Sequence, residues 1–369
     1  MNDTTEKVKY NNIMKIALLG DVALFGCNTA DSNYREKFSL IKDCLNKYDY
    51  IIANLETPLT SSKKTIGGKS AYIKGKAADA EILKYLNITY VSLANNHIFD
   101  YGEKGLQETI SILERNGISW YGVYDKTEEI VGVNDRIKLR GYCCYSTNGK
   151  GMGKYINILN PQKIEGEIRR DIVAGCFPIL SFHWGQEHVH YPNYDHVQVA
   201  HALTDIGNLV IHGHHPHVLQ GIEKIRGSLI AYSMGNFCFD DVYTNKSKEP
   251  LIRLSDNNRE VLILGLEIKG NKIENVNMET FFFSDDTYIK KEEIKDRMKE
   301  CSSFLHIEEE NYRYRRERDL KTYLLQRKKR RNLEWYLRRL NTESMRMVIA
   351  NISNRKMYNS IIRKYIEKA

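Results

Sequence analysis

The polar residues of this chain that could do chemistry follow short apolar runs. Six such runs are followed directly, or within a few positions, by carboxylate, amide or imidazole side chains. These side chains are Asp21, Asn54, Glu56, Asn95, Asn96, His97, Asp100, His183, Glu187, His212, His214, His215, His217 and Asn236. Oxygen and imidazole donors without thiolate suit Mn²⁺, Zn²⁺ or Fe. The pattern predicts a site for one or two such ions, and a pair of ions would activate water and hold both oxygens of a displaced phosphoryl or acyl group.

Each residue also has an ordinary structural interpretation. Asp21 fits a turn or a helix cap, Glu56 fits an exposed loop before Thr57-Pro58, and Asn236 fits a turn after Gly235. The histidines from His212 to His217 are harder to explain in this way, because such density is rare outside metal sites. The joint occurrence therefore favours a site for a metal or a polyanion. Within Asn-Asn-His-x-x-Asp, His97 is the expected protonating or charge-stabilising group, oriented by Asp100.

The elements that must position these residues alternate in type from residue 14 to about residue 236. The runs that predict strands are 14–20, 50–53, 88–94, 118–122, 136–145, 177–182, 209–211 and 229–232, and the helical patterns include 34–47, 79–86, 104–116 and 197–206. A hairpin over 261–283 with a turn at Gly270-Asn271 is predicted to follow. Alternating strands and helices predict a layered α/β fold. Ligands of open α/β sheets bind beyond the carboxyl ends of the strands, so the polar residues should meet there.

The charge of the chain is unevenly distributed. Residues 311–369 carry 18 Lys and Arg against 5 Asp and Glu, a balance of +13, whereas the preceding 310 residues carry 37 against 42, a balance of −5. Beyond residue 285 the pattern becomes long, charged and helical, with apolar residues among cations over 320–340 and five consecutive cations at 327–331. We therefore predict two domains, 1–285 and a basic, mainly helical extension over 286–369. The extension is either a solvated appendage or a surface for anionic lipid, an anionic polymer or a protein.

Composition bounds the class of protein. A mean hydropathy of −0.50 with 42% hydrophobic residues excludes a membrane-embedded chain and a disordered one. Seven cysteines without a CxxC pair favour a reduced, cytoplasmic protein. No signal peptide or transmembrane segment is predicted, and a peripheral membrane position remains an alternative. No base-reading motif accompanies the basic residues, so specific nucleic-acid binding is not expected.

The candidate residues fall into six motifs that follow one another over about residues 14–240. The motifs are Gly20-Asp21; Asn54-Leu55-Glu56-Thr57-Pro58; Ser92-Leu93-Ala94-Asn95-Asn96-His97 with Asp100-Tyr101-Gly102; His183-Trp184-Gly185 with Glu187; Gly213-His214-His215-Pro216-His217-Val218 with Gln220-Gly221; and Ser233-Met234-Gly235-Asn236-Phe237 with Phe239-Asp240. Any one of them is weak evidence, but the set in this order is specific. With these motifs the sequence resembles the capsule-synthesis CapA family, a branch of the calcineurin-like metallophosphoesterase superfold.

The resemblance implies a four-layer α/β/β/α sandwich with the site on loops at one end. It implies Asp21, Glu56, Asn96, His183, His215 and His217 as metal ligands, His97 and Asp100 as catalytic residues, and Asn54, Asn95, Glu187, His214 and Asn236 as substrate-binding residues. Two positions depart from the superfold's pattern. Ala23 stands where the first motif usually has a histidine, and Glu56 stands where the bridging aspartate is usual.

The resemblance also implies a role in the biosynthesis of a capsule, poly-γ-glutamate or a cell-surface polysaccharide. The leading hypothesis is a metal-dependent hydrolase of phosphoester or amide bonds, acting on an anionic polymer or on a phosphorylated small-molecule or lipid-linked substrate. The alternative is a non-catalytic accessory protein that binds an anionic polymer and docks a membrane-bound synthase. The basic extension lies outside the shared motifs, and a membrane-bound synthase or an anionic membrane surface is its expected partner.

Overall fold

Two β-sheets stack face to face in the computed structural model, which describes residues 13–66, 69, 71–144, 152–243, 249–284, 286–329 and 342–368. Within these residues the larger sheet has the order β14-β13-β12-β1-β2-β3-β4, and β11 pairs with β1. Its strands are β1 (Met14–Val22), β2 (Tyr50–Leu55), β3 (Tyr90–Ser92), β4 (Ser119–Tyr121), β11 (Asn236–Cys238), β12 (Glu260–Lys269), β13 (Lys272–Ser284) and β14 (Thr287–Lys290). Strands β1 to β4 run parallel, and β12 to β14 form an antiparallel edge.

The second sheet has the order β5-β6-β7-β8-β10-β9 in the described part of the chain. Its strands are β5 (Glu128–Val131), β6 (Arg136–Cys143), β7 (Phe177–His183), β8 (Val210–His214), β9 (Ile222–Ile225) and β10 (Ser228–Ala231). Strands β6, β7, β8 and β10 are parallel to one another. Their order places the carboxyl ends of β7 and β8, each of which ends in a histidine, side by side.

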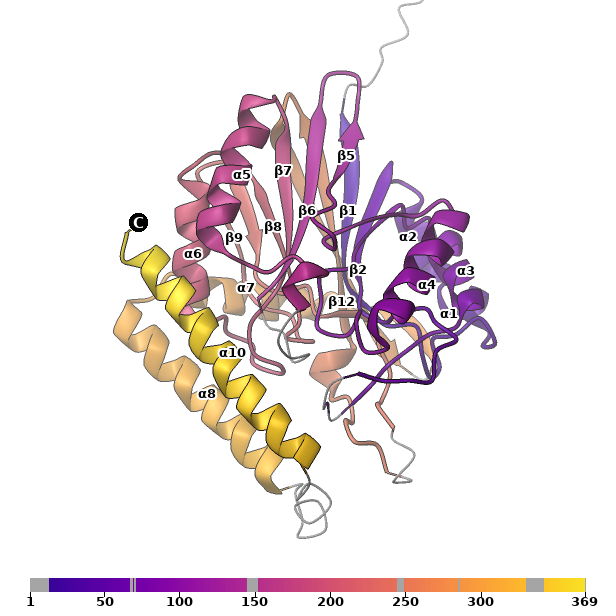
Figure 1. Ribbon diagram of the computed structural model, residues 1–369. Helices are drawn as coiled ribbons and strands as arrows, with labels where there is room; N and C mark the ends of the chain where they lie inside the picture. The colour runs from indigo at the N-terminus through magenta and orange to yellow at the C-terminus, as the bar shows by residue number, and fades with distance from the viewer. Residues whose placement is uncertain are drawn as a thin grey trace, which may run out of the picture.

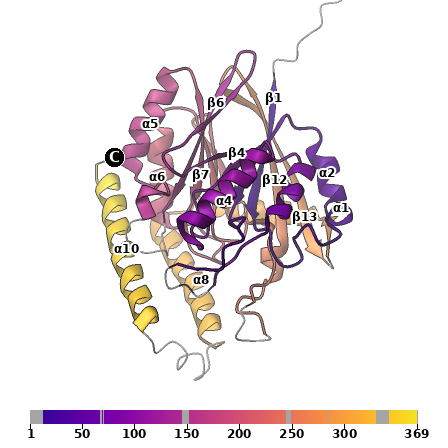
Figure 2. The same ribbon diagram turned by 45° about the vertical axis from the view of Figure 1, so that its right-hand side comes forward.

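Alternating side chains along the strands build the layers. On β1, Ile16 and Leu18 belong to the buried cluster between the two sheets, whereas Ala17 and Leu19 belong to the cluster under the helices. Helices α1 (Tyr34–Lys37), α2 (Ser39–Leu45), α3 (Ala80–Tyr85) and α4 (Gly102–Arg115) cover the larger sheet, and α5 (Pro161–Val173) and α6 (Tyr194–Thr204) cover the other (Figures 1 and 2). The predicted four-layer α/β/β/α sandwich is confirmed.

The end of β1 changes partners, and this change positions the first candidate ligand. Up to Leu18 the strand lies between β2 and β12, but at Asp21 β11 replaces β12, so that Asp21 lies opposite Asn54 and Asn236. The approach is close at Gly20, where an added Cβ would lie 2.3 Å from the carbonyl oxygen of Gly235. A glycine before Asp21 is therefore required for β1 and the 233–236 segment to pack at this distance.

The structure departs from the predicted elements in detail. The predicted helix over 34–47 is broken at Phe38, whose fully buried ring stacks on Phe237 and Tyr288. Packing of this ring takes precedence over helix continuity. The predicted hairpin over 261–283 is confirmed as β12 and β13, with positive φ at Gly270 and Asn271 as a tight two-residue turn requires.

The basic extension is mainly helical where it is described, with α7 (Glu293–Phe304), α8 (Glu309–Lys329) and α10 (Thr342–Ile366). The predicted segment 320–340 and the cation run 327–331 lie partly outside the described residues. Strand β14 continues the larger sheet beyond residue 285, and α10 packs on α5 and α6. The two-domain division stays a prediction. Of the helices that are described, none has both the length and the apolar character needed to cross a bilayer.

Candidate metal centre

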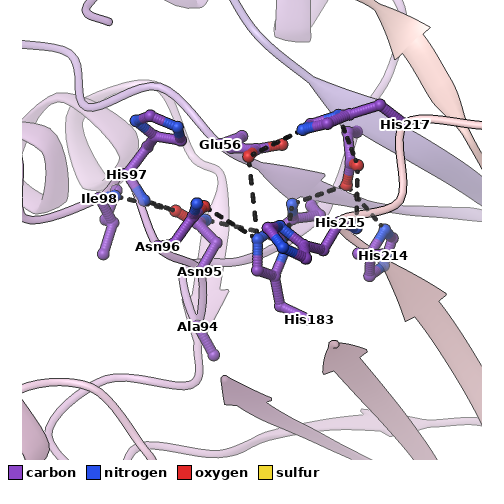
Figure 3. A network of polar contacts seen from close by, with 12 residues as sticks. Glu56, Ala94, Asn95, Asn96, His97, Ile98, His183, His214, His215 and His217 are labelled. Atoms are coloured by element: carbon purple, nitrogen blue, oxygen red, sulfur yellow. Dashed lines mark hydrogen bonds and ion pairs between the residues drawn. The ribbon is translucent and has the colours of Figure 1, made fainter. Parts of the chain in front are cut away.

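Glu56 stands at the centre of the predicted ligands. In the described chain its carboxylate belongs to two groups whose donor atoms all lie within 4.8 Å of one another: Glu56 with His183 and His215, and Glu56 with Asp21 and His217. Figure 3 shows Glu56 lying between His183 and His217. Nε2 of each of these histidines is 3.8 Å from Glu56 Oε1. The structure thus brings five of the six predicted metal ligands together around one shared carboxylate.

The environment of Glu56 is unfavourable for a carboxylate without a cation. The residue is fully buried, and neither carboxylate oxygen has a hydrogen-bond partner among the described residues. Burial raises the pKa of Glu56 well above its ordinary value. A buried carboxylate without a partner is costly, and a coordinated ion removes that cost. Glu56 therefore fits the predicted place of a bridging ligand.

Asp21 is fixed on several sides. Its Oδ1 accepts a hydrogen bond from the Asn54 amide at 2.8 Å, and its Oδ2 accepts one from the His215 backbone N–H at 3.1 Å. Burial acts to raise the pKa of Asp21, but His214 and His217 outweigh it and hold the pKa well below the usual range. The carboxylate is therefore ionised and held in place, as a metal ligand needs.

His183 and His215 are buried, neutral imidazoles that could bind a metal ion. His183 Nε2 is 2.9 Å from the Asn96 amide oxygen, and the rings of His183 and His215 are 4.7 Å apart. Burial lowers the pKa of His183 well below its ordinary value and that of His215 to about 4. Imidazole binds metal only in its neutral form. Because an amide oxygen only accepts, His183 Nε2 donates to Asn96, the sixth predicted ligand, and this proton would leave when Nε2 binds an ion.

The orientation of His217 is set by neighbours outside the metal groups. Its Nδ1 is 3.0 Å from the Asn236 amide oxygen, whereas the Asn236 amide N–H donates to the Asn258 carbonyl at 3.0 Å. Since an amide oxygen only accepts, Nδ1 of His217 carries a proton, and Nε2 faces Glu56. Burial acts to lower the pKa of His217, but Glu56 and Asp21 raise it to about 10, so the imidazole is protonated until a metal ion replaces the proton. Asn258 also donates to the His217 carbonyl at 2.8 Å. His215 and His217 both have positive φ, 96° and 56°, so the His-Pro-His turn is held in a strained backbone conformation.

His97 and Asp100 form the predicted pair beside this centre. His97 Nδ1 is 2.7 Å from Asp100 Oδ2, and Lys69 Nζ is 2.5 Å from Asp100 Oδ1. Burial acts to raise the pKa of Asp100, but Lys69 and then His97 hold it below its ordinary value. Burial lowers the pKa of His97 more strongly than Asp100 raises it. The ionised carboxylate therefore orients the imidazole, with Nδ1–H toward Asp100 and Nε2 available.

The residues predicted to bind substrate lie beside the centre, but the side chains of three of them make hydrogen bonds within the protein. Asn95 donates to Asn54 Oδ1 and the Leu55 carbonyl. Its own oxygen accepts from the backbone N–H groups of His97 and Ile98 (Figure 3). Asn54 is bonded to Asp21, and Asn236 to His217. These three side chains hold the ligand loops together, and their contact with substrate stays a prediction.

His214 and Glu187 occupy different positions at the centre. His214 is buried, and its Nδ1 lies 3.1 Å from Asp21 Oδ1, on the protein side of that carboxylate. His212 lies deeper, with its ring 4.1 Å from that of His214 and its Nε2 2.7 Å from the Leu19 carbonyl. Glu187 is half-buried and acts to raise the pKa of both His215 and His217. Glu187 is thus the predicted substrate residue nearest to solvent at this site.

The place of the missing histidine is apolar. Ala23 is fully buried in a cluster with Ile73, Phe239, Val242 and Leu254. The ring of Phe239 in turn lies 4.9 Å from that of His217. One side of the centre is therefore lined by hydrocarbon where the superfold's pattern has an imidazole.

Two residues of the site carried no usable signal in the sequence. Lys69 lies in an irregular segment without a motif, and it reaches Asp100 from 31 positions away. Asn258, in the short helix η3 (Asp256–Arg259), binds the His217 carbonyl over 41 positions. Both act through long-range contacts that local patterns do not encode. Together with the buried, unsatisfied Glu56 and the neutral imidazoles of His183 and His215, they complete a donor set that fits divalent metal.

Comparison with known proteins gives one family. The family model described as "Bacterial capsule synthesis protein PGA_cap" matches residues 15–241. "PGA biosynthesis protein CapA" of Bacillus subtilis is 28% identical over 277 residues, which are 68% of this chain and 70% of that protein. "Probable polyglutamine synthesis accessory protein Rv0574c" of Mycobacterium tuberculosis is 27% identical over 213 residues, 52% of this chain and 56% of that protein. Among solved structures, Haemophilus influenzae NAD nucleotidase matches 78% of this chain and 55% of its own, with 15% identity and a TM-score of 0.40.

Proposed function

This chain belongs to the PGA_cap family of bacterial capsule synthesis proteins, and from that premise we propose that it is a metal-dependent hydrolase of phosphoester or amide bonds. The observation that carries the proposal is the buried carboxylate of Glu56, which is shared by two groups of potential metal ligands and has no hydrogen-bond partner in the described chain. A structural role alone gives no reason to bury an unsatisfied carboxylate among five other ligand-type side chains.

The metal ligands of the proposed enzyme are Asp21, Glu56, Asn96, His183, His215 and His217. One or two divalent ions, Mn, Zn or Fe, would supply Lewis-acid polarisation of the scissile group and a nucleophilic water. The Nδ1–H of His97 is engaged by Asp100 at 2.7 Å, so its Nε2 would accept a proton from the attacking water and then donate it to the leaving group. Lys69 keeps Asp100 ionised and the imidazole in one orientation. Glu187, at the solvent side, faces the substrate.

The printed names of the relatives favour poly-γ-glutamate, or another anionic polymer of the cell surface, as the substrate class. A γ-glutamyl bond is an amide, and a lipid-linked or phosphorylated precursor carries a phosphoester. Both reactions pass through a centre that gains negative charge on oxygen, which metal ions and a positioned histidine stabilise. The proposal therefore covers both bond types until substrates are compared.

The test measures metal content and hydrolysis on the same samples. Full-length protein is loaded with Mn, Zn or Fe, and its metal is counted by mass spectrometry. It is then assayed on a generic phosphodiester and on a γ-glutamyl oligomer. His97→Gln should retain the metal and lose hydrolysis, while His306→Gln, at an exposed histidine outside the centre, serves as the matched control. Metal-loaded wild type that is inactive on both substrates would rule out the enzyme.

One observation favours a second candidate function. Ala23 and its apolar neighbours replace one imidazole of the superfold's pattern, and one relative is named an accessory protein. We therefore propose as the alternative a non-catalytic protein that binds an anionic polymer at the centre and docks a membrane-bound synthase. Metal-loaded protein that binds poly-γ-glutamate in calorimetry and leaves its length unchanged would support this role. Shortening of the polymer would reject it.

A further inference from the structure

Among the described residues, the hydrogen bonds and buried side chains that hold the C-terminal helices α8 and α10 on the sandwich lie mostly in one half of each helix. In the first half of α8, Tyr312 Oη donates to the Pro192 carbonyl at 2.8 Å, and Arg316 Nε donates to the Tyr191 carbonyl at 3.3 Å. In the second half of α10, Tyr358 Oη is 3.0 Å from His196 Nε2, and Ile362 is buried against the sandwich. The two helices lie side by side in both views (Figures 1 and 2). The second half of α8 and the first half of α10 differ from these anchored halves.

Those other halves expose aliphatic side chains. On α10 the exposed residues are spaced i, i+3, i+4 and i+7, which places them on one helix face. The exposed aliphatic residues of the two halves are Leu324, Leu325, Met345, Val348, Ile349 and Ile352, with exposed fractions from 47% to 65%. We call these six residues the distal apolar surface. Single exposed apolar residues are normal, but such a group on adjoining helices marks an interaction site.

The charge around the distal apolar surface is strongly positive. From residue 320 to residue 366 the sequence carries 13 Lys and Arg and two acidic residues. Six of these cations are exposed on the described parts of the two helices: Lys321, Lys328, Arg355, Lys356, Arg363 and Lys364. A partner for this surface must therefore offer both hydrocarbon and negative charge.

We propose that the distal apolar surface binds the headgroup region of an anionic lipid bilayer. An anionic bilayer meets both requirements, because aliphatic side chains enter the acyl boundary while flanking Lys and Arg reach the phosphates. A second copy of the chain offers hydrocarbon but would bring two basic extensions together, which repel each other. None of the described helices is long and apolar enough to span a membrane, so α8 and α10 would lie on the surface of the bilayer.

Lipid binding at this surface would also place the metal centre near the membrane. Tyr323 precedes Leu324 on α8, and its ring is 5.3 Å from that of His188, which is 6.3 Å from the ring of His217. This consequence rests on the proposed function, since it favours a lipid-linked substrate. The lipid binding itself does not depend on hydrolysis.

The test is co-sedimentation of the full-length protein with vesicles. Mixed phosphatidylcholine–phosphatidylglycerol vesicles are compared with pure phosphatidylcholine vesicles, at low and at high salt. One variant combines Val348→Ser, Ile349→Ser and Ile352→Ser, and its matched control places serine at three exposed valines of the sandwich, Val131, Val133 and Val173. A second variant combines Lys328→Glu, Arg355→Glu and Lys356→Glu, and its control reverses Lys64, Lys269 and Lys272.

We expect wild type and both controls to bind anionic vesicles, and each surface variant to bind at least about tenfold more weakly. Absence of binding by wild type, equal binding to neutral vesicles, or equal loss in the controls would overturn the proposal. A dimer in sedimentation velocity that the serine variant dissociates, without vesicle binding, would assign the surface to a second copy. Metal content is measured on the same samples, so a failed metal centre is distinguished from a failed membrane surface.

Discussion

Replacing Glu56 by glutamine should have opposite effects on the metal-free and the metal-loaded protein. The substitution keeps the size of the side chain and removes the buried negative charge. In the metal-free protein Glu56 has no hydrogen-bond partner among the described residues, and burial raises its pKa. Its folded-state pKa lies above the unfolded value, so the ionised form costs stability at neutral pH. The metal-free variant should therefore be at least as stable as the wild type.

The metal-loaded protein should respond in the other direction, because Glu56 belongs to both ligand groups. At a metal concentration about 100 times Kd, binding stabilises the wild type by about 2.7 kcal/mol. A change in a supporting residue of a metal site already costs about 10–100-fold in affinity, so loss of a shared ligand should cost at least about 100-fold. The variant would then gain only about 0.4 kcal/mol at the same concentration. At about 2 °C per kcal/mol for a chain of this size, Tm should rise by about 5 °C in the wild type and by less than about 1 °C in the variant.

The assay is thermal unfolding of chelator-treated protein during titration with Mn²⁺ or Zn²⁺, together with metal counting. Glu223→Gln is the control, because Glu223 is also buried but accepts hydrogen bonds from Tyr232 at 2.6 Å and His201 at 2.7 Å. This control should lose stability without metal and keep the full response to metal. Full metal content and an unchanged Tm response in the Glu56 variant would refute the reasoning. So would a metal-free variant destabilised by several kcal/mol, since that result would show a partner for the carboxylate.

The other predictions concern the histidine pair, a buried carboxylate and the extension. His97→Gln should lower hydrolysis by about 10²–10⁴-fold with unchanged metal content, because it removes proton transfer and leaves the ligands; loss of metal would contradict this. Burial acts to raise the pKa of Glu223, but His201 and Tyr232 hold it below its ordinary value. Its stabilisation is therefore present above about pH 4.3 and lost as pH falls through the folded pKa. Glu223→Gln should cost about 1–3 kcal/mol at pH 7 in urea unfolding, and the difference should shrink in acid; a constant difference would contradict the pKa argument. Tyr312→Phe should lower the free energy of unfolding by about 1 kcal/mol, because the buried Pro192 carbonyl loses its donor; an unchanged value would show that α8 is not held there.

The positions of the ligands could be predicted because they follow strand ends. A parallel strand that ends at a polar residue places that residue at the common edge. Asp21 and His183 end or nearly end their strands, and His215 directly follows β8. The same reasoning predicted which segments meet but not which atoms touch. Asn95 was predicted to contact substrate, but its amide makes hydrogen bonds within its own loop and to the loop after β2. Which way an amide points cannot be read from its position after a strand.

The parts of the structure that escaped prediction depend on contacts between distant segments. Lys69 belongs to no periodic element, so its ion pair with Asp100 had no local signature. Phe38 interrupts a sequence with good helical pattern because Tyr288, far along the chain, packs on it. The short strand β11 forms because the end of β1 turns away from β12 and needs a partner for its backbone. In each case tertiary packing decided between conformations that the local sequence allows.

The donor set of the centre is divided between the two sheets, and this division has a mechanical consequence. Asn96 and His183 are 87 residues apart in the chain, and Asp21 and His215 are 194 apart. An ion held by both sides would act as a cross-link between the sheets, closing long loops in the chain much as a disulfide does. Slow hydrogen exchange should then extend through β1, β2, β7 and β8 as one cooperative unit when metal is bound. Without metal, sliding of one sheet over the other would be opposed by the apolar contacts between them and by these hydrogen bonds.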